Sequence, residues 1–380
     1  MLFRCPHQIG TAEHDAIDGV EEIRRNLGYA LTVPARWYGV LRRATFARSI
    51  RGSNSIEGIV VSQEDAVAAI ENEEPMDADA ETWRAIKGYR DAMTFVLQLA
   101  KDQQFTLSEG FIRSLHFMIT QYDLKKNPGR WRPGPIYVRN EERQEIVYEG
   151  PDFELVPGLM AELIEYLNTR TSEHPLIRAA TAHFNLAKIH PFSDGNGRMA
   201  RCLHTLVLAR EGILEPVFSS IEEYLGRNTM EYYRVLEAVG DKKWNPPADC
   251  SPWINYVLLA HYRQAETYLR RIRETRRVWD ELEELIKSHK LPERIIMALS
   301  DATFGYKVRN ATYRAAAEIG RIQIASRDLN QAAVAGLIQP HGAGRGRYYT
   351  ATDVLRAIRE RARETEQRQE PEVISQLGLF

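Results

Sequence analysis

The sequence predicts a mainly α-helical protein with one β-hairpin near its middle and a winged helix-turn-helix domain at its C-terminus. Apolar residues recur at helical spacing over most of the 380 residues. Turn residues and two short β-like runs interrupt this spacing between residues 127 and 148. From residue 291, three short helical segments and a glycine-rich hairpin follow one another, which is the element order of a winged helix.

The composition is that of a globular protein, with 44% hydrophobic and 27% charged residues. The formal net charge of −2 excludes a general polyanion binder. The sequence has no apolar run long enough to cross a bilayer and no secretory signal at its N-terminus. Cys5, Cys202 and Cys250 share no close spacing, which excludes a disulfide framework and a CxxC zinc site. We therefore expect a cytoplasmic protein that contacts no membrane.

Helical periodicity dominates the first 289 residues. The segment 81–100 carries a broad apolar stripe, and the segment 107–120 carries another. Beyond residue 156, the spacing predicts helices over 157–169, 174–189, 197–211 and 228–238. A long charged helix is predicted over about 251–289, and its second half is polar on most faces, as in a helix that connects two domains.

The interruption between residues 127 and 148 indicates a single hairpin. Turn-forming residues occupy 127–129 and 132–135. The runs 136–138 and 146–148 are rich in β-branched and aromatic residues, and the polar segment 139–145 joins them.

The C-terminal unit differs from the rest of the chain in charge. Residues 290–364 contain thirteen Lys or Arg and seven Asp or Glu, a net charge of +6, so the remainder carries −8. This asymmetry is typical of a nucleic-acid module attached to an acidic protein. Predicted helices cover 292–299, 309–318 and 322–335, and the third would be the recognition helix. The candidate DNA contacts are Ser326 and Arg327 on that helix, and Arg345 and Arg347 in the hairpin. The alternative is a protein-docking module, because winged helices serve that role too.

Residues 190–201, HPFSDGNGRMAR, lie between two strongly helical runs and have the features of an anion site. The glycines around Asn196 open the second helix, where free backbone N–H groups and the helix dipole favour negative charge. Arg198 and Arg201 project from its first turn, and two guanidinium groups suit a di- or triphosphate. Asp194 is a hard oxygen ligand where a phosphate-bound Mg²⁺ would need one. His190 is suited to take a proton from an incoming hydroxyl.

Each of these features also has a purely structural interpretation. A histidine at a helix end is often a capping or packing residue, Gly-Asn-Gly alone is often a turn, and paired arginines on a helix often face solvent. His183 and His190 are seven residues apart, too far for the i, i+4 arrangement of a zinc-binding helix.

The segment 190–201 resembles the signature of the Fic family, H-x-F-x-[D/E]-G-N-G-R-x-x-R, and agrees with it at every fixed position. Residues 135–148 resemble the flap hairpin of the family, and the residues before them resemble the segment that precedes the flap. The resemblance covers about residues 35–265. It implies a helical Fic core with a β-hairpin flap, and the C-terminal winged helix resembles an appendage of many bacterial Fic proteins.

The resemblance implies transfer of AMP from ATP to a Ser, Thr or Tyr hydroxyl of a protein, with Mg²⁺. By match to the signature, His190 would be the general base and Asp194 would hold Mg²⁺. The nucleotide would be bound by Gly195, Asn196, Gly197, Arg198, Met199, Ala200 and Arg201, and Tyr233 would border the adenine. The related Doc proteins, which transfer phosphate, have Lys at the position of Gly197, so this glycine favours AMP transfer.

Residues 53–58, SNSIEG, match the inhibitory pattern [S/T]-x-x-x-E-[G/N] of the family, N-terminal to the core as in class II members. Ser53, Glu57 and Gly58 are its fixed positions. A carboxylate that reaches Arg201 would occupy the guanidinium meant for the γ-phosphate. The alternative is a helix-capping glutamate followed by a glycine stop.

These assignments divide the chain into five parts: an N-terminal helical region with the inhibitory motif (1–105), a Fic catalytic core (106–265), a connecting helix (266–290), a winged helix-turn-helix domain (291–365) and a tail (366–380). The predicted function is autoinhibited adenylyl transfer to a target protein presented along the flap near 135–148. Two other functions stay open: a DNA-binding regulator that senses nucleotide, and removal of AMP, in which Glu57 positions a water. The sequence also leaves a homodimer open.

Overall fold

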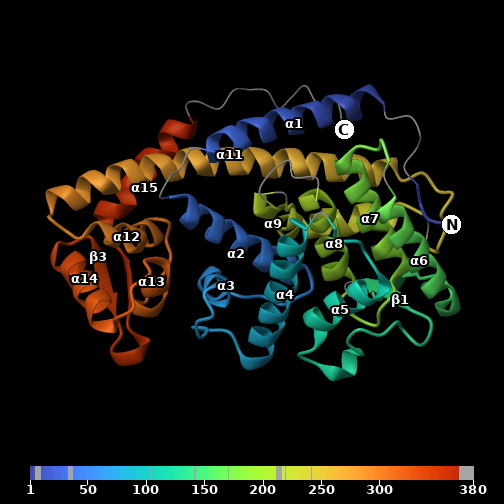
Figure 1. Cartoon of the computed structure of the whole chain (residues 1–380), viewed down its shortest axis with the longest axis horizontal. Helices are drawn as coiled ribbons and strands as arrows, with labels where there is room; N and C mark the ends of the chain where they lie inside the picture. Colours follow the sequence, from blue (N-terminus) through green and yellow to red (C-terminus); the bar gives the residue numbers. More distant parts are fainter. Residues whose placement is uncertain are drawn as a thin grey trace.

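The computed structural model describes residues 1–4, 10–32, 37–102, 104–140, 143–169, 171–210, 216–218, 220–240 and 242–367. Cys5 and residues 368–380 of the predicted tail lie outside these ranges. The protein is mainly α-helical, as the sequence predicts. A long helix, α11 (Ser251–Ser288), runs along the molecule, with one helix above it in the view and most other elements beneath it in two groups (Figure 1). None of the helices in the described ranges is both long and apolar enough to cross a bilayer.

The N-terminal region forms α1 (Thr11–Thr32), α2 (Tyr38–Ile56), α3 (Gln63–Ile70) and α4 (Ala80–Leu99). α1 packs along α11, and α2 packs against α9 (Glu222–Arg227). Side-chain caps fix the starts of α3 and α4, because Ser62 accepts a hydrogen bond from the N–H of Asp65 and Asp79 accepts one from the N–H of Thr82.

The central helices are α5 (Glu109–Thr120), α6 (Val156–Asn168), α7 (Pro175–Ile189), α8 (Asn196–Arg210) and α10 (Thr229–Ala238). These helices, α4 and α11 correspond to the helices predicted between residues 81 and 289. Short 3₁₀ turns occupy Leu124–Lys126, Phe153–Leu155, Pro216–Phe218, Glu293–Ile295 and Gly344–Gly346.

The predicted flap is a hairpin of β1 (Tyr137–Asn140) and β2 (Glu145–Glu149), which pair antiparallel with a bulge between Val138 and Arg139. At the end of β2, the N–H of Glu149 donates to the carbonyl of Lys242, which lies outside the hairpin (2.8 Å). In the described residues, β2 is the partner of β1, and the other edge of β1 is open.

The C-terminal unit consists of α12 (Ile296–Thr303), α13 (Asn310–Ala316), α14 (Ile322–Val334), β3 (Ile338–His341), β4 (Tyr348–Ala351) and α15 (Asp353–Gln367). The strands pair antiparallel, and Val308 adds a bridge to Tyr349. Up to β4 this is the predicted order of elements, whereas α15 was not predicted, and the assignment as a DNA-binding winged helix stays a prediction. α15 turns back and packs on α11.

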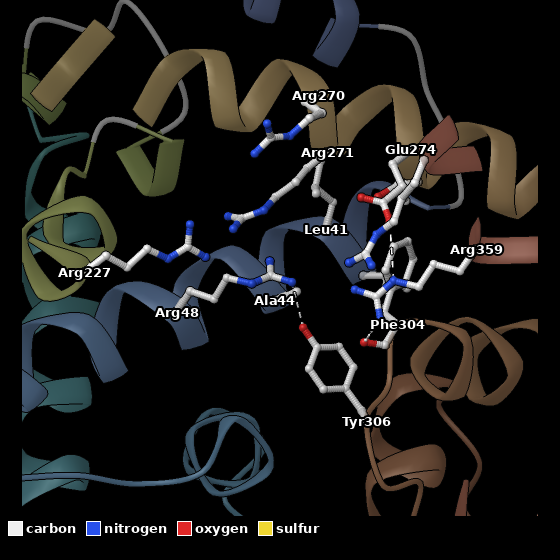
Figure 2. A pocket seen from close by; sticks show the side chains of 13 residues that line it. Leu41, Ala44, Arg48, Arg227, Arg270, Arg271, Glu274, Phe304, Tyr306 and Arg359 are labelled. Atoms are coloured by element: carbon white, nitrogen blue, oxygen red, sulfur yellow. Dashed lines mark hydrogen bonds and ion pairs between the residues drawn. The ribbon is translucent and has the colours of Figure 1, made fainter. Parts of the chain in front are cut away.

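The C-terminal unit contacts α2 through polar groups. The guanidinium of Arg43 forms an ion pair with the carboxylate of Asp301 (2.6 Å), and both side chains are buried. Five residues further along α2, Arg48 donates a hydrogen bond to the hydroxyl of Tyr306 (2.8 Å; Figure 2).

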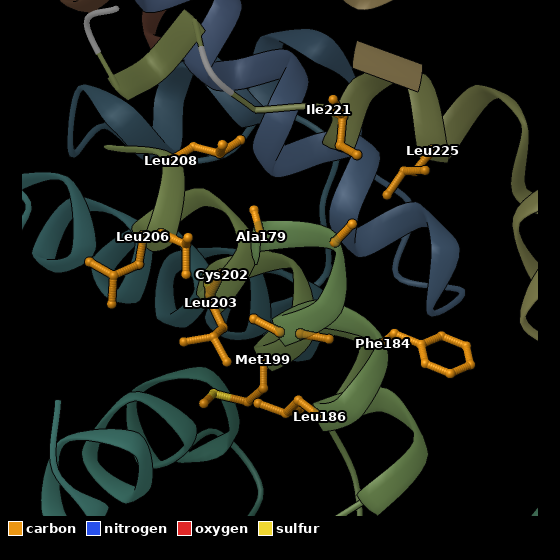
Figure 3. Packing of buried hydrophobic residues seen from close by; sticks show 14 of the residues in the cluster. Ala179, Phe184, Leu186, Met199, Cys202, Leu203, Leu206, Leu208, Ile221 and Leu225 are labelled. Carbon is orange, nitrogen blue, oxygen red and sulfur yellow. The ribbon is translucent and has the colours of Figure 1, made fainter. Parts of the chain in front are cut away.

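α7 and α8 form the centre of the larger hydrophobic core. Their facing side chains, which include Leu186, Met199 and Leu203, are fully buried (Figure 3). Residues of α4, α5, α6 and the first half of α11 surround this pair. The loop between α7 and α8, which carries the signature, is therefore held at both ends by tightly packed helices.

Candidate functional site

The loop between α7 and α8 depends on two residues in the left-handed backbone region. His190 caps α7 with φ 51° and ψ 58°, and its N–H donates to the carbonyl of Leu186 (3.0 Å). Gly195 has φ +77° immediately before α8 begins. Glycine adopts this conformation without the strain that a Cβ would add. The two turns bring the His190 side chain back toward the start of α8.

Asn196 and Phe192 hold the loop rigid. The side-chain amide of Asn196 accepts from the N–H of Phe192 (2.9 Å) and donates to its carbonyl (2.8 Å). The Phe192 ring stacks on His116 of α5 with ring centroids 3.7 Å apart. The Asn196 side chain is thus fully used within the loop, and its backbone N–H is what remains for a ligand.

The first turn of α8, residues 196–199, has the geometry of an anion-binding cradle. The first N–H groups of a helix lack intrahelical partners and carry the positive end of the helix dipole. The carboxylate of Glu57, at the end of α2, lies against this turn, and a Cβ on Gly197 would collide with it. The chain therefore places one of its own carboxylates where the sequence predicts an anionic ligand.

Arg201 is held by the two predicted residues of α2. Its Nη2 atom lies 2.7 Å from Oε1 of Glu57 and 2.9 Å from the carbonyl of Ser53, and its Nε donates to the Ser53 hydroxyl (2.7 Å). Burial alone would lower the pKa of this guanidinium, but the carboxylate of Glu57 outweighs burial and raises the pKa above its ordinary value.

Three guanidinium nitrogens at this site are unsatisfied. Nε and Nη1 of Arg198 and Nη1 of Arg201 are buried and have no hydrogen-bond partner among the described residues. Both side chains are 1% exposed. A buried donor without a partner is costly, and an anionic oxygen is the acceptor that would satisfy it. Together with the cradle, these donors fit a phosphate group.

Asp194 is ionised and only partly buried. Its carboxylate lies 2.6 Å from Nζ of Lys126 and accepts from the N–H of Gly195 (2.5 Å). Burial opposes ionisation, but Lys126 and Arg198 outweigh it and lower the pKa of Asp194. The described residues contain no group of three or more His, Cys, Asp or Glu that would hold a metal alone. One ionised carboxylate fits Mg²⁺ only if phosphates and waters supply the other ligands, which is the usual arrangement for this ion.

His190 is neutral, with a defined tautomer. Its Nδ1 lies 3.0 Å from the carbonyl of Ala187, so Nδ1 carries the hydrogen and Nε2 keeps its lone pair. Burial lowers the pKa of the imidazole below its ordinary value. The ring is therefore a free base at neutral pH.

The comparisons with known proteins agree with this geometry. Residues 106–208 match the Fic/DOC family. This chain contains a Fic domain. A Fic family protein from Desulfovibrio desulfuricans G20 shares the fold with a TM-score of 0.58 and 24% identity, covering 92% of this chain and 98% of the other. Fic-1 (aa134–508) from C. elegans shares it with a TM-score of 0.52 and 22% identity, covering 68% and 72%.

Two curated relatives carry names that state an activity. Protein adenylyltransferase Fic of Nematostella vectensis is 25% identical over 274 residues, which are 70% of this Fic protein and 58% of the relative. Protein adenylyltransferase fic-1 of Caenorhabditis briggsae is 35% identical over 106 residues, which are 27% and 18% of the two chains. This Fic protein thus spans little more than half of the first relative and less than a fifth of the second.

The remaining signature residues serve the fold of the Fic core. Met199 and Ala200 are fully buried among apolar side chains, so only their backbone can contact a nucleotide.

Two predicted residues outside the signature lie near the end of α2. Tyr233, predicted to border adenine, is 43% exposed and donates to the carbonyl of Ile56 (3.0 Å). Gly58 ends α2 with φ +75°.

The predicted DNA contacts lie at the far end of the molecule. Arg327 on α14 and Arg347 beside β4 are exposed, whereas Ser326 is half-buried and accepts a hydrogen bond from Asn310 (2.9 Å). The side chain of Arg345 lies outside what the structure describes. Their contact with DNA stays a prediction.

Two residues of the site, Arg132 and Lys126, were not predicted from the sequence. Arg132, buried below the flap, donates through Nε to the carbonyl of His190 (2.9 Å), and its N–H donates to the carbonyl of Pro191 (2.9 Å). Lys126 supplies the cation beside Asp194. Both precede the signature by more than 50 residues and belong to no motif, so only the fold brings them to the site.

Proposed function

We propose that this Fic protein transfers AMP from ATP to a hydroxyl side chain of a target protein or of itself, and that Glu57 holds it inactive. One observation carries the proposal: the Glu57 carboxylate lies at the start of α8 and pairs with Arg201 beside unsatisfied guanidinium nitrogens. The names of the curated relatives support the activity.

Binding of the triphosphate follows from the chemistry of the cradle. The first N–H groups of α8 would bind phosphate oxygens, and Arg198 and Arg201 would clamp the outer phosphates. Asp194 would hold Mg²⁺, which would neutralise the negative charge that develops on the phosphates. Lys126 must then give up part of its contact with Asp194, because both cations need the same carboxylate.

His190 would perform the proton transfer. Its Nε2 takes the proton of the target hydroxyl while the hydroxyl oxygen attacks the α-phosphorus. An O–P bond to the target forms, the bond between the α-phosphorus and its bridging oxygen breaks, and pyrophosphate leaves. Arg132 holds the carbonyl of His190 and thereby fixes the imidazole relative to the cradle.

The proposed inhibition is competition for one guanidinium. While Glu57 pairs with Arg201, that guanidinium is unavailable to the γ-phosphate, and a second anion in the cradle would meet the carboxylate. ATP would then bind only in a pose unsuited to in-line attack at the α-phosphorus.

The flap supplies the surface on which a target would lie. The carbonyl of Ile136 accepts from the N–H of Gly150 (3.1 Å), so the adjacent backbone of Tyr137 faces the open edge of β1. A target segment would add as a strand there and be held by main-chain hydrogen bonds, with little demand on its sequence.

The test is self-modification with labelled ATP. We expect Glu57→Gly to raise incorporation by at least about tenfold, because it frees a buried guanidinium for the γ-phosphate. Adding His190→Ala should abolish incorporation while ATP binding persists, since the base acts on the acceptor. Glu81→Gly, at an exposed position in the first turn of α4, is the matched control. Equal incorporation by the wild type and Glu57→Gly would contradict the proposed inhibition.

The same assay separates the alternative activity. If Glu57 instead positions a water for removal of AMP, a modified target should lose mass with wild type and keep it with Glu57→Gly. Mass spectrometry of one target with and without ATP distinguishes addition from removal.

A further inference from the structure

A cavity of about 480 Å³ lies outside the cradle, where α2, α11 and α15 meet (Figure 2). Among the described residues, its walls carry arginines from four helices: Arg48 of α2, Arg227 of α9, Arg270 and Arg271 of α11, and Arg359 and Arg363 of α15. Ala44, Leu41 and Phe304 supply apolar wall between them. A volume of this size is typical of a small-molecule site.

Leaving Arg270 aside, two carboxylates neutralise part of the charge of the other five arginines. Glu223 accepts two hydrogen bonds from Arg271 (both 2.6 Å) and also pairs with Arg227. Glu274 pairs with Arg359 (3.4 Å) and Arg363 (3.2 Å). Both carboxylates are shared between two arginines each, so these five arginines keep a net positive charge.

Arg48 has the least compensated charge of the group. Among the described residues, it donates a hydrogen bond to the neutral hydroxyl of Tyr306 (2.8 Å) and forms no ion pair. Burial, together with the neighbouring Arg271 and Arg227, outweighs the opposing effects of Tyr306 and Glu223 and lowers the pKa of its guanidinium. An arginine stays protonated at neutral pH, so burial of this charge destabilises the fold. A bound anion would offset that destabilisation by pairing with the guanidinium.

We propose that this cavity binds a compact anion that carries two or more phosphate groups. Guanidinium groups from separate helices point into one space (Figure 2), and each can present two parallel N–H donors to phosphate oxygens. A monovalent anion would leave most of the charge uncompensated, whereas a di- or triphosphate matches it in charge. The apolar walls leave room for an organic group attached to the phosphates.

The cavity is linked to the catalytic site through α2. Arg48 lies five residues before Ser53, and α2 ends in Glu57 on Arg201. Between them, Gly52 packs so closely on α9 that a Cβ would lie 2.5 Å from the carbonyl of Glu222. A ligand that binds this arrangement of α2, α9 and α11 stabilises it by mass action. This consequence rests on the proposed function: the ligand should strengthen the proposed inhibition and lower AMP transfer.

Binding is tested by calorimetry with inorganic tripolyphosphate on the full chain at constant ionic strength. Wild type is suitable, because the Glu57 carboxylate lies in the catalytic cradle and weakens the binding of a second anion there. We expect one binding event, about tenfold weaker or more in Arg48→Gln and in Arg363→Gln, since each removes a charged donor to phosphate. Arg234→Gln, which removes an exposed arginine on α10, should bind as the wild type does.

The outcomes separate the possible sites. Loss of binding in Arg198→Gln with retention in Arg48→Gln would assign the phosphate to the catalytic cradle and overturn the proposal. Binding displaced by duplex DNA as effectively as by pyrophosphate would overturn it in favour of a nucleic-acid surface. If Arg48→Gln fails to fold by circular dichroism, Arg363→Gln decides, because its side chain is half exposed and ion-paired at the rim.

The link to catalysis has a separate readout. In the wild type, tripolyphosphate should lower the rate of self-modification. In Arg48→Gln, it should cause only the smaller inhibition that comes from its competition with ATP at the cradle. Identical inhibition curves in the two forms would overturn the link while leaving the binding site in place. If no form transfers AMP, the proposed function fails, and calorimetry still decides the binding site.

Discussion

Gly197 and Glu57 share one small volume at the start of α8. Any side chain at position 197 would collide with the Glu57 carboxylate and would lie 3.1 Å from Nη1 of Arg201. The absence of a Cβ therefore allows an oxygen anion to reach both the helix N-terminus and the guanidinium. The same geometry suits a carboxylate of the chain and a phosphate of a ligand, which is why the two would compete.

His190 combines two features that a proton acceptor at neutral pH needs. The hydrogen bond of Nδ1 to Ala187 leaves Nε2 unprotonated, and burial keeps the pKa of the ring below its ordinary value. Glu57 acts in the opposite direction, because its negative charge favours the imidazolium.

The pH dependence of transfer follows from this lowered pKa. Because the neutral imidazole is the active form, transfer by Glu57→Gly should be constant from pH 8 to 7. It should fall only as the pH drops through the folded pKa, below about 6.5. Removing Glu57 also removes a charge that raises this pKa, which moves the acid limb further down. An acid limb with an apparent pKa at or above 7 in initial-rate measurements would contradict the assigned base.

At the scale of an element, the end of α2 is compatible with both interpretations of residues 53–58, an inhibitory motif and a helix cap followed by a glycine stop. The N–H of Ile59 donates to the carbonyl of Asn54 (3.1 Å) and the N–H of Gly58 to that of Ser55 (3.1 Å), which is a Schellman motif with Gly58 in the left-handed region. Glu57 is thus a helix cap with a glycine stop, and its side chain also reaches Arg201. The cap is what aims the carboxylate at the cradle.

Gly58→Ala tests that dependence. Alanine at φ +75° costs about 1 kcal/mol relative to glycine, which should loosen the end of α2 and raise self-modification several-fold, less than Glu57→Gly does. The matched control is Gly158→Ala in α6, where a Cβ meets nothing within 4 Å and helical geometry tolerates it. Incorporation is compared at equal protein concentration. If the two alanine variants behave alike, the cap does not position Glu57.

Local patterns predicted the central elements well. The apolar spacing located α4 to α8, α10, α11 and α12 to α14, because each helix buries one face at its own period, and turn residues located the hairpin. The short α9 and α15 were not predicted from this spacing. The signature and the short motif predicted a contact between Arg201 and Glu57, which lie 2.7 Å apart, whereas the roles of these residues and of His190 stay predictions. What the sequence did not reveal was contact across long separations, such as Arg132 with the His190 carbonyl or Lys126 with Asp194, since no periodicity encodes it.

At the scale of the whole molecule, α11 joins two hydrophobic cores in the described residues. Its first half belongs to the core around α7 and α8, and its second half to a core that includes α12, α14 and α15. That second core also contains Trp37 and Leu41 from the N-terminal region. The sequence predicted a polar connector here, and no pattern in it indicated the contact between the first 60 residues and the C-terminal unit, because the two are more than 200 residues apart.

The ion pair between Arg43 and Asp301 tests how tightly α2 holds the C-terminal unit. Asp301→Ala leaves a buried guanidinium uncompensated apart from Glu71 at 3.4 Å, and we expect a loss of about 3 kcal/mol in the free energy of unfolding. Asp353→Ala removes an almost fully exposed carboxylate and should cost less than about 0.5 kcal/mol. Urea unfolding followed by fluorescence measures both. Equal urea midpoints for Asp301→Ala and Asp353→Ala would mean that the contact between α2 and the C-terminal unit contributes little to the free energy of unfolding.

The central claim is that the cradle at the start of α8 holds the triphosphate once Glu57 is removed. Its most direct test is a crystal structure of Glu57→Gly with Mg²⁺ and a non-hydrolysable ATP analogue. We predict phosphate oxygens on the first N–H groups of α8 and on the guanidiniums of Arg198 and Arg201, with Asp194 on the metal. A triphosphate bound elsewhere, with Arg201 still free of phosphate, would contradict the account.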